Sequence, residues 1–167
     1  MVTPTTMEEY MLIGLQNAGS FMLIAMTFIG MGDIVTLDCM NWIVGDPEPK
    51  IVRAMSVIGR VMNDIAYHKS EKRKSGHRVA SAVECYMKQY ETTEEEAISE
   101  LCQQVTDAWK DVNKEFFHPT DIPMPLLMRV LDLVRVNHEM YRDGDGFTDS
   151  ILLKDLIASL IVDPLSV

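Results

Sequence analysis

The sequence predicts an all-α protein, and three kinds of observation predict it. Apolar residues recur at three- and four-residue spacing over several long stretches, which is the period of an amphipathic helix. Helix-start signals precede these stretches, for example the Thr-Thr-Glu-Glu-Glu run at residues 92–96. The strict apolar–polar alternation of a strand persists nowhere. We therefore expect one domain over residues 1–167, built from six or seven helices with short links.

The first helix is predicted to begin after Thr6. Glu8 and Glu9 lie in its first turn, where acidic side chains suit the positive end of the helix dipole. The helix is expected to extend to about Met31, with a kink at residues 17–20.

The stretch from residue 12 to residue 32 is apolar enough to suggest a membrane span. Gln16, Asn17 and Ser20 interrupt it, however, and the remaining apolar run is shorter than the roughly 20 residues that a bilayer requires. No Lys or Arg precedes it, as would be typical of a signal peptide. We expect a helix that is buried on all sides inside a larger helical bundle, and no membrane partner.

Helical periodicity is strongest between residues 50 and 70, where Ile51, Met55, Ile58 and Met62 recur on one side. Turns marked by Gly, Asp or Pro separate this helix from the others. Further helices are expected at residues 37–44, 80–90, 94–116, 126–141 and 151–162.

Composition narrows the function classes. The formal net charge is −10, and a nucleic acid or an anionic membrane surface requires a basic protein, so we expect neither partner. The three cysteines, Cys39, Cys85 and Cys102, are odd in number and form no Cys-x-x-Cys pair. We expect free, buried thiols in a reducing compartment rather than a zinc site or disulfides.

One face of the strongly periodic helix carries polar residues. Asn63, Tyr67 and Glu71 follow at four-residue spacing, which places them along one stripe roughly 12 Å long. The oxygen atoms of Asn63 and Glu71 suit a hard cation such as Mg²⁺. Arg60, on the same side, suits a polyanion such as diphosphate. Asp64 lies about 100° from the stripe and is expected to bond a neighbouring helix. The alternative is an ordinary solvated helix face.

Longer runs of sequence are similar to a known family. Asn63, Asp64 and Glu71 fit the pattern (N/D)Dxx(S/T)xxxE, and GHRVASAVECYMKQY follows shortly after. In chain order, the other matching runs are EEYM, FIGMGDIV, PKIVRA, TEEEAISELCQQVTDAWKDVN, LLMRVLDLVRVNHEMYRDGDGFTDS and LIVDPL. Together they resemble the carboxy-terminal catalytic domain of plant class I terpene synthases, especially the sesquiterpene synthases, over nearly the whole chain.

The resemblance implies a fold and an activity. The fold is all-α, a partial class I terpenoid synthase helical bundle around a deep apolar pocket. The activity is that of a lyase that uses Mg²⁺, with Mn²⁺ as a substitute, to ionise farnesyl diphosphate and cyclise the resulting carbocation. The pocket must be dry, because water would quench the cation.

The resemblance also implies a role for individual residues. The first, fifth and ninth positions of the family motif bind metal, and these positions are Asn63, Tyr67 and Glu71. Residues matching the pocket lining are Asn17, Ala18, Gly19 and Phe147, of which the first three match a kinked-helix stretch whose backbone carbonyls face the pocket. Residues with implied catalytic roles are Arg60, which binds diphosphate, and Tyr141 and Asp145 of the YxxxDG(Y/F)T segment.

The sequence departs from the family at several positions. Tyr67 replaces the Ser or Thr of the motif, which weakens one metal position. The segment after Glu71 is about two residues longer than is typical of the family, so the register of Arg73 and Lys74 toward diphosphate stays open. The second metal motif of the family, DDxxD, is absent from residues 1–167. We therefore expect the chain to be inactive alone.

Two other interpretations stay open. One is a non-catalytic helical module that associates with a partner chain through the apolar helix at residues 12–31. The other is a half-enzyme that regains activity with a separately encoded amino-terminal half. No Ser- and Arg-rich transit segment precedes the matching region, which favours a cytoplasmic location.

Overall fold

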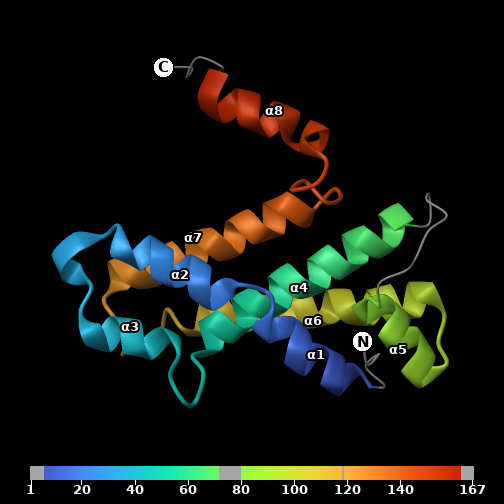
Figure 1. The fold of residues 1–167 in the computed structure, drawn as a ribbon, viewed down its shortest axis with the longest axis horizontal. Coiled ribbons are helices and arrows are strands. Elements are labelled where there is room, and N and C mark those ends of the chain that lie inside the picture. Colours follow the sequence, from blue (N-terminus) through green and yellow to red (C-terminus); the bar gives the residue numbers. More distant parts are fainter. Residues whose placement is uncertain (1–5, 72–79, 118, 163–167) are drawn as a thin grey trace.

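The computed structural model describes residues 6–71, 80–117 and 119–162, except for the side chain of Glu71. Helices dominate this part of the chain, and no strand occurs within it, so the all-α prediction is confirmed. In chain order (Figure 1) the elements are α1 (Met7–Gln16), α2 (Ser20–Ile29), η1 (Gly32–Ile34), α3 (Leu37–Ile43), α4 (Lys50–Glu71), α5 (Ala82–Tyr90), α6 (Glu94–Lys114), α7 (Met124–Tyr141), η2 (Ser150–Leu153), α8 (Lys154–Ile157) and η3 (Ala158–Val162).

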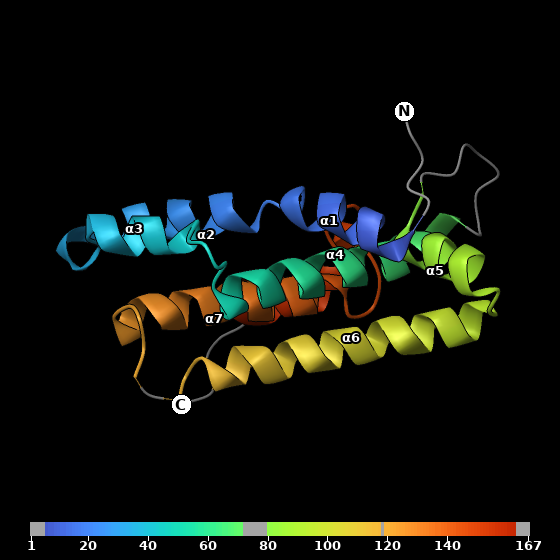
Figure 2. The same ribbon diagram turned by 90° about the horizontal axis from the view of Figure 1, so that it is seen from below.

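The main helices form three layers, which Figure 2 shows edge-on. α1, α2 and α3 form one outer layer, α4 and α7 lie side by side in the middle, and α6 forms the opposite layer. α5 packs at one end against α1, α4 and α6. The middle layer is therefore the one in which buried side chains meet from both directions.

α4 is the centre of the hydrophobic core. It contacts α1, α2, α5, α6 and α7, and it is the longest helix among the described residues. Ile51, Met55 and Ile58 are fully buried, as the apolar periodicity of the sequence predicted, whereas Met62 is only half-buried. Val61, which the periodicity did not single out, is also fully buried. Because α4 is held on several sides, the polar residues that it carries are positioned by the core itself.

Local sequence signals define most helix starts. Thr93 accepts a hydrogen bond from Glu96 N while the Glu96 carboxylate accepts from Thr93 N, which is the predicted capping box of α6. α7 begins at Met124, two residues before the predicted start. A proline in the first turn of a helix is well tolerated, because its missing N–H has no helical partner at that position.

The predicted kink in the first helix is a complete break between α1 and α2. Thr6 and Glu9 form a capping box at the start of α1, and Asn17 ends the helix. Gly19 then adopts φ +75°, a left-handed conformation that favours glycine, before α2 begins at Ser20. α2 ends at Ile29, two residues before the predicted Met31.

The expectation that this region is buried on all sides does not hold within the described chain. Leu12 is 66% exposed, Met26 is 64% exposed and Ile29 is 74% exposed. Only one side of α1 and α2 packs against α4, α5 and α7. The segment Met7–Ile29 is long and apolar enough to cross a membrane by length and composition alone, which is weak evidence for a membrane helix.

The end of the chain differs from the single helix predicted at residues 151–162. Asp149 caps a 3₁₀ turn, η2, by accepting a hydrogen bond from Ile151 N. α8 is a single α-helical turn, and η3 continues it with π-helical geometry. This segment projects from the end of α7, away from the other helices (Figure 1), and most of its side chains are exposed. Without packing against the bundle, nothing enforces one regular helix.

All three cysteines are free, as predicted. Cys39 and Cys85 are buried, and burial raises the pKa of the Cys85 thiol. The prediction of burial is wrong for Cys102, which is exposed because it lies on the solvent side of α6 while its neighbour Leu101 is buried.

Candidate functional site

The predicted polar stripe lies on the last three turns of α4. Asn63 and Tyr67 are half-buried, and Glu71 is the final residue of the helix, with its side chain outside the described structure. Because α4 is a continuous α-helix through this region, positions 63, 67 and 71 share one face. The backbone carbonyl of Tyr67 accepts a hydrogen bond from Ser70 Oγ at 2.8 Å. Arg73 and Lys74 also lie outside the described residues.

Tyr141, at the end of α7, meets this stripe. Partial burial raises the pKa of its phenol, and the charge of Asp145 adds to this rise. A hydrogen bond from Asn63 and the charge of Arg60 act in the opposite direction. Arg60, Asn63, Tyr141 and Asp145 are far apart in the sequence, yet each is close enough to affect the same hydroxyl.

Asn63 also carries an amide oxygen, and amide oxygens are ligands for hard cations. Its half-buried side chain lies on the same face of α4 as Tyr67, one turn later.

Asp145 is held by the turn that follows α7. Its Oδ1 accepts hydrogen bonds from Phe147 N at 3.1 Å and Thr148 N at 3.2 Å, and its Oδ2 accepts one from Thr148 Oγ1 at 2.6 Å. Gly146 N donates to Met140 O at 2.8 Å, which folds the turn back onto the helix. The turn keeps a negative charge fixed beside Tyr141.

The residues predicted to line a pocket are less closely connected to Asn63 and Tyr141. Phe147 is 61% exposed, and its ring centroid lies 5.5 Å from that of Tyr141. The helix break carries Asn17, which is exposed, and Ala18 and Gly19, which are half-buried. Within the described residues, no hydrogen bond joins this break to Asn63 or Tyr141.

Arg60 and Asp64 are part of a network that joins three helices. Asp64 is buried and accepts hydrogen bonds from Tyr10 Oη at 2.6 Å, Arg60 Nη2 at 2.8 Å and Ala82 N at 3.0 Å. The prediction that Asp64 bonds a neighbouring helix is confirmed. Tyr10 of α1 was not predicted, because no local pattern links it to a residue 54 positions away. Burial and the Asp64 carboxylate raise the pKa of Tyr10, which keeps its hydroxyl protonated.

The donors of this region suit a metal ion with few protein ligands. Among the described residues, no three His, Cys, Asp or Glu side chains cluster closely enough to hold a metal. Asp64 is not available as a ligand, since its oxygens already accept four hydrogen bonds. Asn63 and Tyr67 offer neutral oxygens, and Mg²⁺ commonly completes its shell with water and phosphate oxygens.

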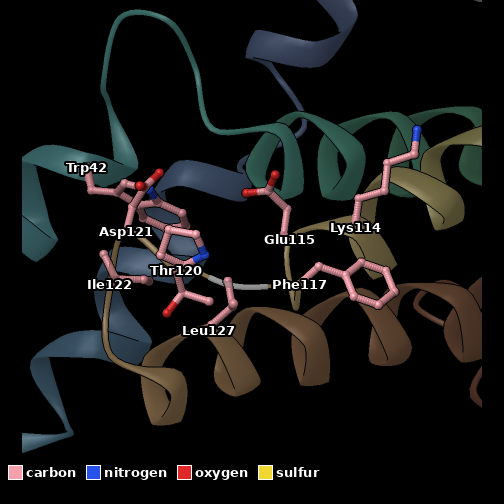
Figure 3. A pocket seen from close by; sticks show the side chains of 9 residues that line it. Trp42, Lys114, Glu115, Phe117, Thr120, Asp121, Ile122 and Leu127 are labelled. Atoms are coloured by element: carbon pink, nitrogen blue, oxygen red, sulfur yellow. The ribbon is translucent and has the colours of Figure 1, made fainter.

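Three clefts in the described surface are lined by other residues. One holds about 90 Å³ near Trp42, Glu115 and Asp121 (Figure 3), room for a few water molecules only. Another, of about 390 Å³, adjoins His68. The largest, of about 660 Å³, runs along α1 beside Leu15 and has a size typical of ligand sites. None of the three is lined by Arg60, Asn63 or Tyr141.

The fold is that of class I terpenoid synthases. The chain superimposes on isoprene synthase from grey poplar leaves with a TM-score of 0.81 and 21% identity, over 98% of this chain and 30% of that one. It superimposes on abietadiene synthase from Abies grandis with a TM-score of 0.79 and 23% identity, over 96% of this chain and 20% of that one. At these identities the likeness establishes the fold alone, and it confirms the predicted partial bundle.

The chain belongs to the terpene synthase family, because residues 2–111 match the family's metal binding domain. It is 48% identical to (−)-germacrene D synthase of Vitis vinifera and 47% identical to sesquiterpene synthase 2 of Toona sinensis, in each case over 97% of this chain. It is 42% identical to (+)-delta-cadinene synthase isozyme A of Gossypium arboreum. The chain spans only 28% to 29% of the length of these relatives.

Proposed function

We propose that this chain carries part of the active site of a sesquiterpene synthase, the part that binds Mg²⁺ and the diphosphate of a prenyl substrate. The complete reaction would be the Mg²⁺-dependent ionisation of farnesyl diphosphate and cyclisation of the resulting carbocation. The similarity to germacrene D and delta-cadinene synthases supports a sesquiterpene substrate. We place the chain in the cytoplasm, and we expect Mn²⁺ to replace Mg²⁺.

One observation carries this proposal. Asn63 lies one turn after Arg60 on α4, and both are close enough to Tyr141 of α7 to oppose the rise in the pKa of its phenol. An oxygen ligand for a hard cation therefore lies close to a permanent positive charge, which is the combination that a metal-bound diphosphate requires. Asp64, which the sequence places next to Asn63, is excluded from the ligand set by its four hydrogen bonds.

The residues of the chain have distinct roles in this scheme. Arg60 stabilises the negative charge that develops on the leaving diphosphate, and bound magnesium supplies further positive charge there. Asn63, Tyr67 and Glu71 are the proposed metal ligands. Tyr141 lies close to Asn63, and burial together with the Asp145 charge keeps the Tyr141 phenol protonated. Asn17, Ala18, Gly19 and Phe147 are proposed to line the hydrocarbon side of the substrate pocket.

The chain alone is proposed to bind Mg²⁺ and diphosphate without turning over farnesyl diphosphate. It spans 28% of its germacrene D synthase relative, and residues 1–167 contain no DDxxD motif for the remaining metal ions. Losing the metal ligands of that motif removes several kcal/mol of transition-state stabilisation, which amounts to orders of magnitude in rate.

Replacing Glu71 with alanine tests the metal assignment. Titration calorimetry of the purified chain with inorganic pyrophosphate is expected to show binding that requires Mg²⁺. Glu71→Ala is expected to weaken this binding at least about tenfold, since even indirect supports of a metal commonly contribute that much to affinity. Glu100→Ala, which removes an exposed carboxylate from α6, is the matched control and is expected to have no effect. Unchanged binding by Glu71→Ala would show that the metal lies elsewhere.

A second candidate function is a helical module that associates with a partner chain. The observation that favours it is the apolar surface of α1–α2, which we define as Leu12, Ile13, Met22, Met26 and Ile29, all more than half exposed. Exposed apolar surfaces of this kind commonly mark sites of protein association. This function and the first are compatible, because the surface lies on α1 and α2 while the proposed ligands lie on α4.

Charge placed on this surface should prevent association. In sedimentation analysis, the unmodified chain is expected to form dimers or larger species, and Met26→Glu is expected to shift it toward monomer. Val136→Glu, on α7, is the control, because Val136 is 51% exposed but lies outside the apolar surface of α1–α2. A chain that is monomeric without any substitution would contradict the second candidate and leave the first unaffected.

A further inference from the structure

The guanidinium of Arg60 is held on two of its three nitrogens. Nε donates to Asp64 Oδ2 at 3.3 Å, and Nη2 donates to Asp64 Oδ1 at 2.8 Å and to Tyr10 Oη at 2.9 Å. A guanidinium has five N–H groups, so these bonds engage three of them. Within the described residues, the two N–H groups of Nη1 have no hydrogen-bond partner.

Tyr10 makes a different contribution to this arrangement from that of Asp64. Asp64 is on the same helix as Arg60, one turn away, so their ion pair alone could form in several side-chain conformations. Tyr10 comes from α1 and bonds both partners, because its hydroxyl donates to Asp64 at 2.6 Å and accepts from Arg60 at 2.9 Å. Because Tyr10 is on a second helix, its hydrogen bonds restrict the side-chain conformations that the Arg60–Asp64 ion pair could adopt by itself.

The packing of α1 against Arg60 also limits the conformations that the arginine side chain can adopt. The Cζ atom of Arg60 lies 5.7 Å from the centre of the Tyr10 ring, within the range of a cation–π contact. A Cβ added at Gly14, one turn after Tyr10, would lie 3.4 Å from Cγ of Arg60, so the backbone of α1 runs close along the arginine stem. The side chain of Arg60 is 26% exposed, which leaves part of it accessible.

We propose that Tyr10 is a positioning residue for Arg60: with Asp64, it fixes the guanidinium so that Nη1 remains free to bind the diphosphate. The effect on diphosphate binding rests on the proposed function, whereas the orientation of the guanidinium does not. Without the Tyr10 hydroxyl, Arg60 keeps its charge and its partner Asp64 but rotates among several orientations. Diphosphate binding must then restrict this rotation, which lowers the affinity.

Tyr10→Phe tests the orientation directly by NMR of the chain labelled with ¹⁵N-arginine. In the unmodified chain, rotation about the Nε–Cζ bond of Arg60 is expected to be slow, so that its four Nη protons give separate signals. Tyr10→Phe is expected to merge these signals through faster rotation. Arg60→Lys identifies them by their loss, and Tyr90→Phe is the control, because Tyr90 is 51% exposed on α5. Arg60 signals that stay separate in Tyr10→Phe would overturn the proposal.

The consequence for binding is tested by a double-mutant cycle with Mg²⁺ and inorganic pyrophosphate. Tyr10→Phe is expected to weaken binding by about three- to tenfold, within the range that one ordinary hydrogen bond contributes. In an Arg60→Lys background the same substitution is expected to change the affinity less than about twofold, because the guanidinium that Tyr10 positions is no longer present. Equal losses in both backgrounds would contradict a role that acts through Arg60 and indicate a general structural role.

The two experiments separate failure of this inference from failure of the proposed function. If the unmodified chain did not bind pyrophosphate at any Mg²⁺ concentration, the proposed function would be wrong, and the NMR signals alone would decide whether Tyr10 orients Arg60. If pyrophosphate bound but Tyr10→Phe left both the signals and the affinity unchanged, the inference would be wrong and the proposed function would stand. Circular dichroism establishes that each variant is folded at the temperature of measurement.

Discussion

Replacing Asp64 with alanine is expected to lower the free energy of unfolding by about 3–5 kcal/mol, the loss typical of breaking a buried ion pair from one side. Asp64 is 2% exposed and accepts four hydrogen bonds, from Tyr10, from two nitrogens of Arg60 and from Ala82 N. Alanine would leave all of these donors without an acceptor and the Arg60 charge without its counter-ion. Total stabilities are commonly about 5–15 kcal/mol, so this single change removes a large part.

Urea denaturation followed by circular dichroism measures this loss. The control is Asp132→Ala on α7, because Asp132 also pairs with two arginines, Arg129 at 3.3 Å and Arg135 at 3.4 Å. Its side chain is 45% exposed, and solvent-exposed ion pairs contribute only about 0–1 kcal/mol. If Asp64→Ala lowered the free energy of unfolding no more than Asp132→Ala does, the Asp64 network would contribute no more than an ordinary surface ion pair.

The Asp64 substitution also separates stability from binding. Asp64 is not a proposed metal ligand, so Asp64→Asn, which keeps the shape of the side chain, is expected to weaken pyrophosphate binding only through Arg60. The network joins α1, α4 and the start of α5, and we expect the loss to appear as a general decrease in stability rather than as local fraying.

Replacing Phe28 with alanine is expected to cost about 3–5 kcal/mol, the usual range for removing a buried phenylalanine and leaving a cavity. Phe28 is fully buried, and it is one of three buried residues of α2, with Ser20 and Ile24. Because α2 packs against the bundle through so few side chains, the loss of Phe28 should loosen the whole helix. α2 contacts both α4 and α7, and the loss of Phe28 is expected to weaken this packing.

Phe117→Ala is the matched control for this prediction, since Phe117 is 76% exposed and its removal should change stability by less than about 0.5 kcal/mol. Hydrogen exchange of the α2 amides, measured together with denaturation, is expected to show faster exchange in Phe28→Ala than in Phe117→Ala. If Phe28→Ala cost less than about 1 kcal/mol, α2 would not be packed on the middle layer in solution.

The positions of the helices could be predicted closely from the sequence, because helix signals are local. The apolar spacing of residues 50–70 predicted α4, which is Lys50–Glu71, and the run at 92–96 predicted the capping box of α6. The prediction failed for residues 151–162, where periodicity indicated one helix and the structure has three short turns. Apolar periodicity shows only that a segment could bury one face as a helix. Residues 151–162 have little to pack against, so no regular helix is stabilised there.

The candidate site could be predicted in part. The four-residue spacing of Asn63, Tyr67 and Glu71 required only that α4 be continuous, which it is. That Tyr141 meets Asn63 was not predictable from spacing, because the two residues lie on different helices. The carboxylate of Asp64 was expected to bond a neighbouring helix, but which helix supplied its partner depended on how α1 and α5 pack.

The amino-acid sequence alone determined most of the helices, the polar stripe on α4 and the apolar character of residues 12–31, since each follows from residues a few positions apart. The tertiary structure decided that Tyr10 bonds Arg60 across 50 positions, and that one side of α1 and α2 stays exposed. The physical reason is that a helix face has no partner until other helices pack against it. Which groups then meet depends on the arrangement of all the layers together.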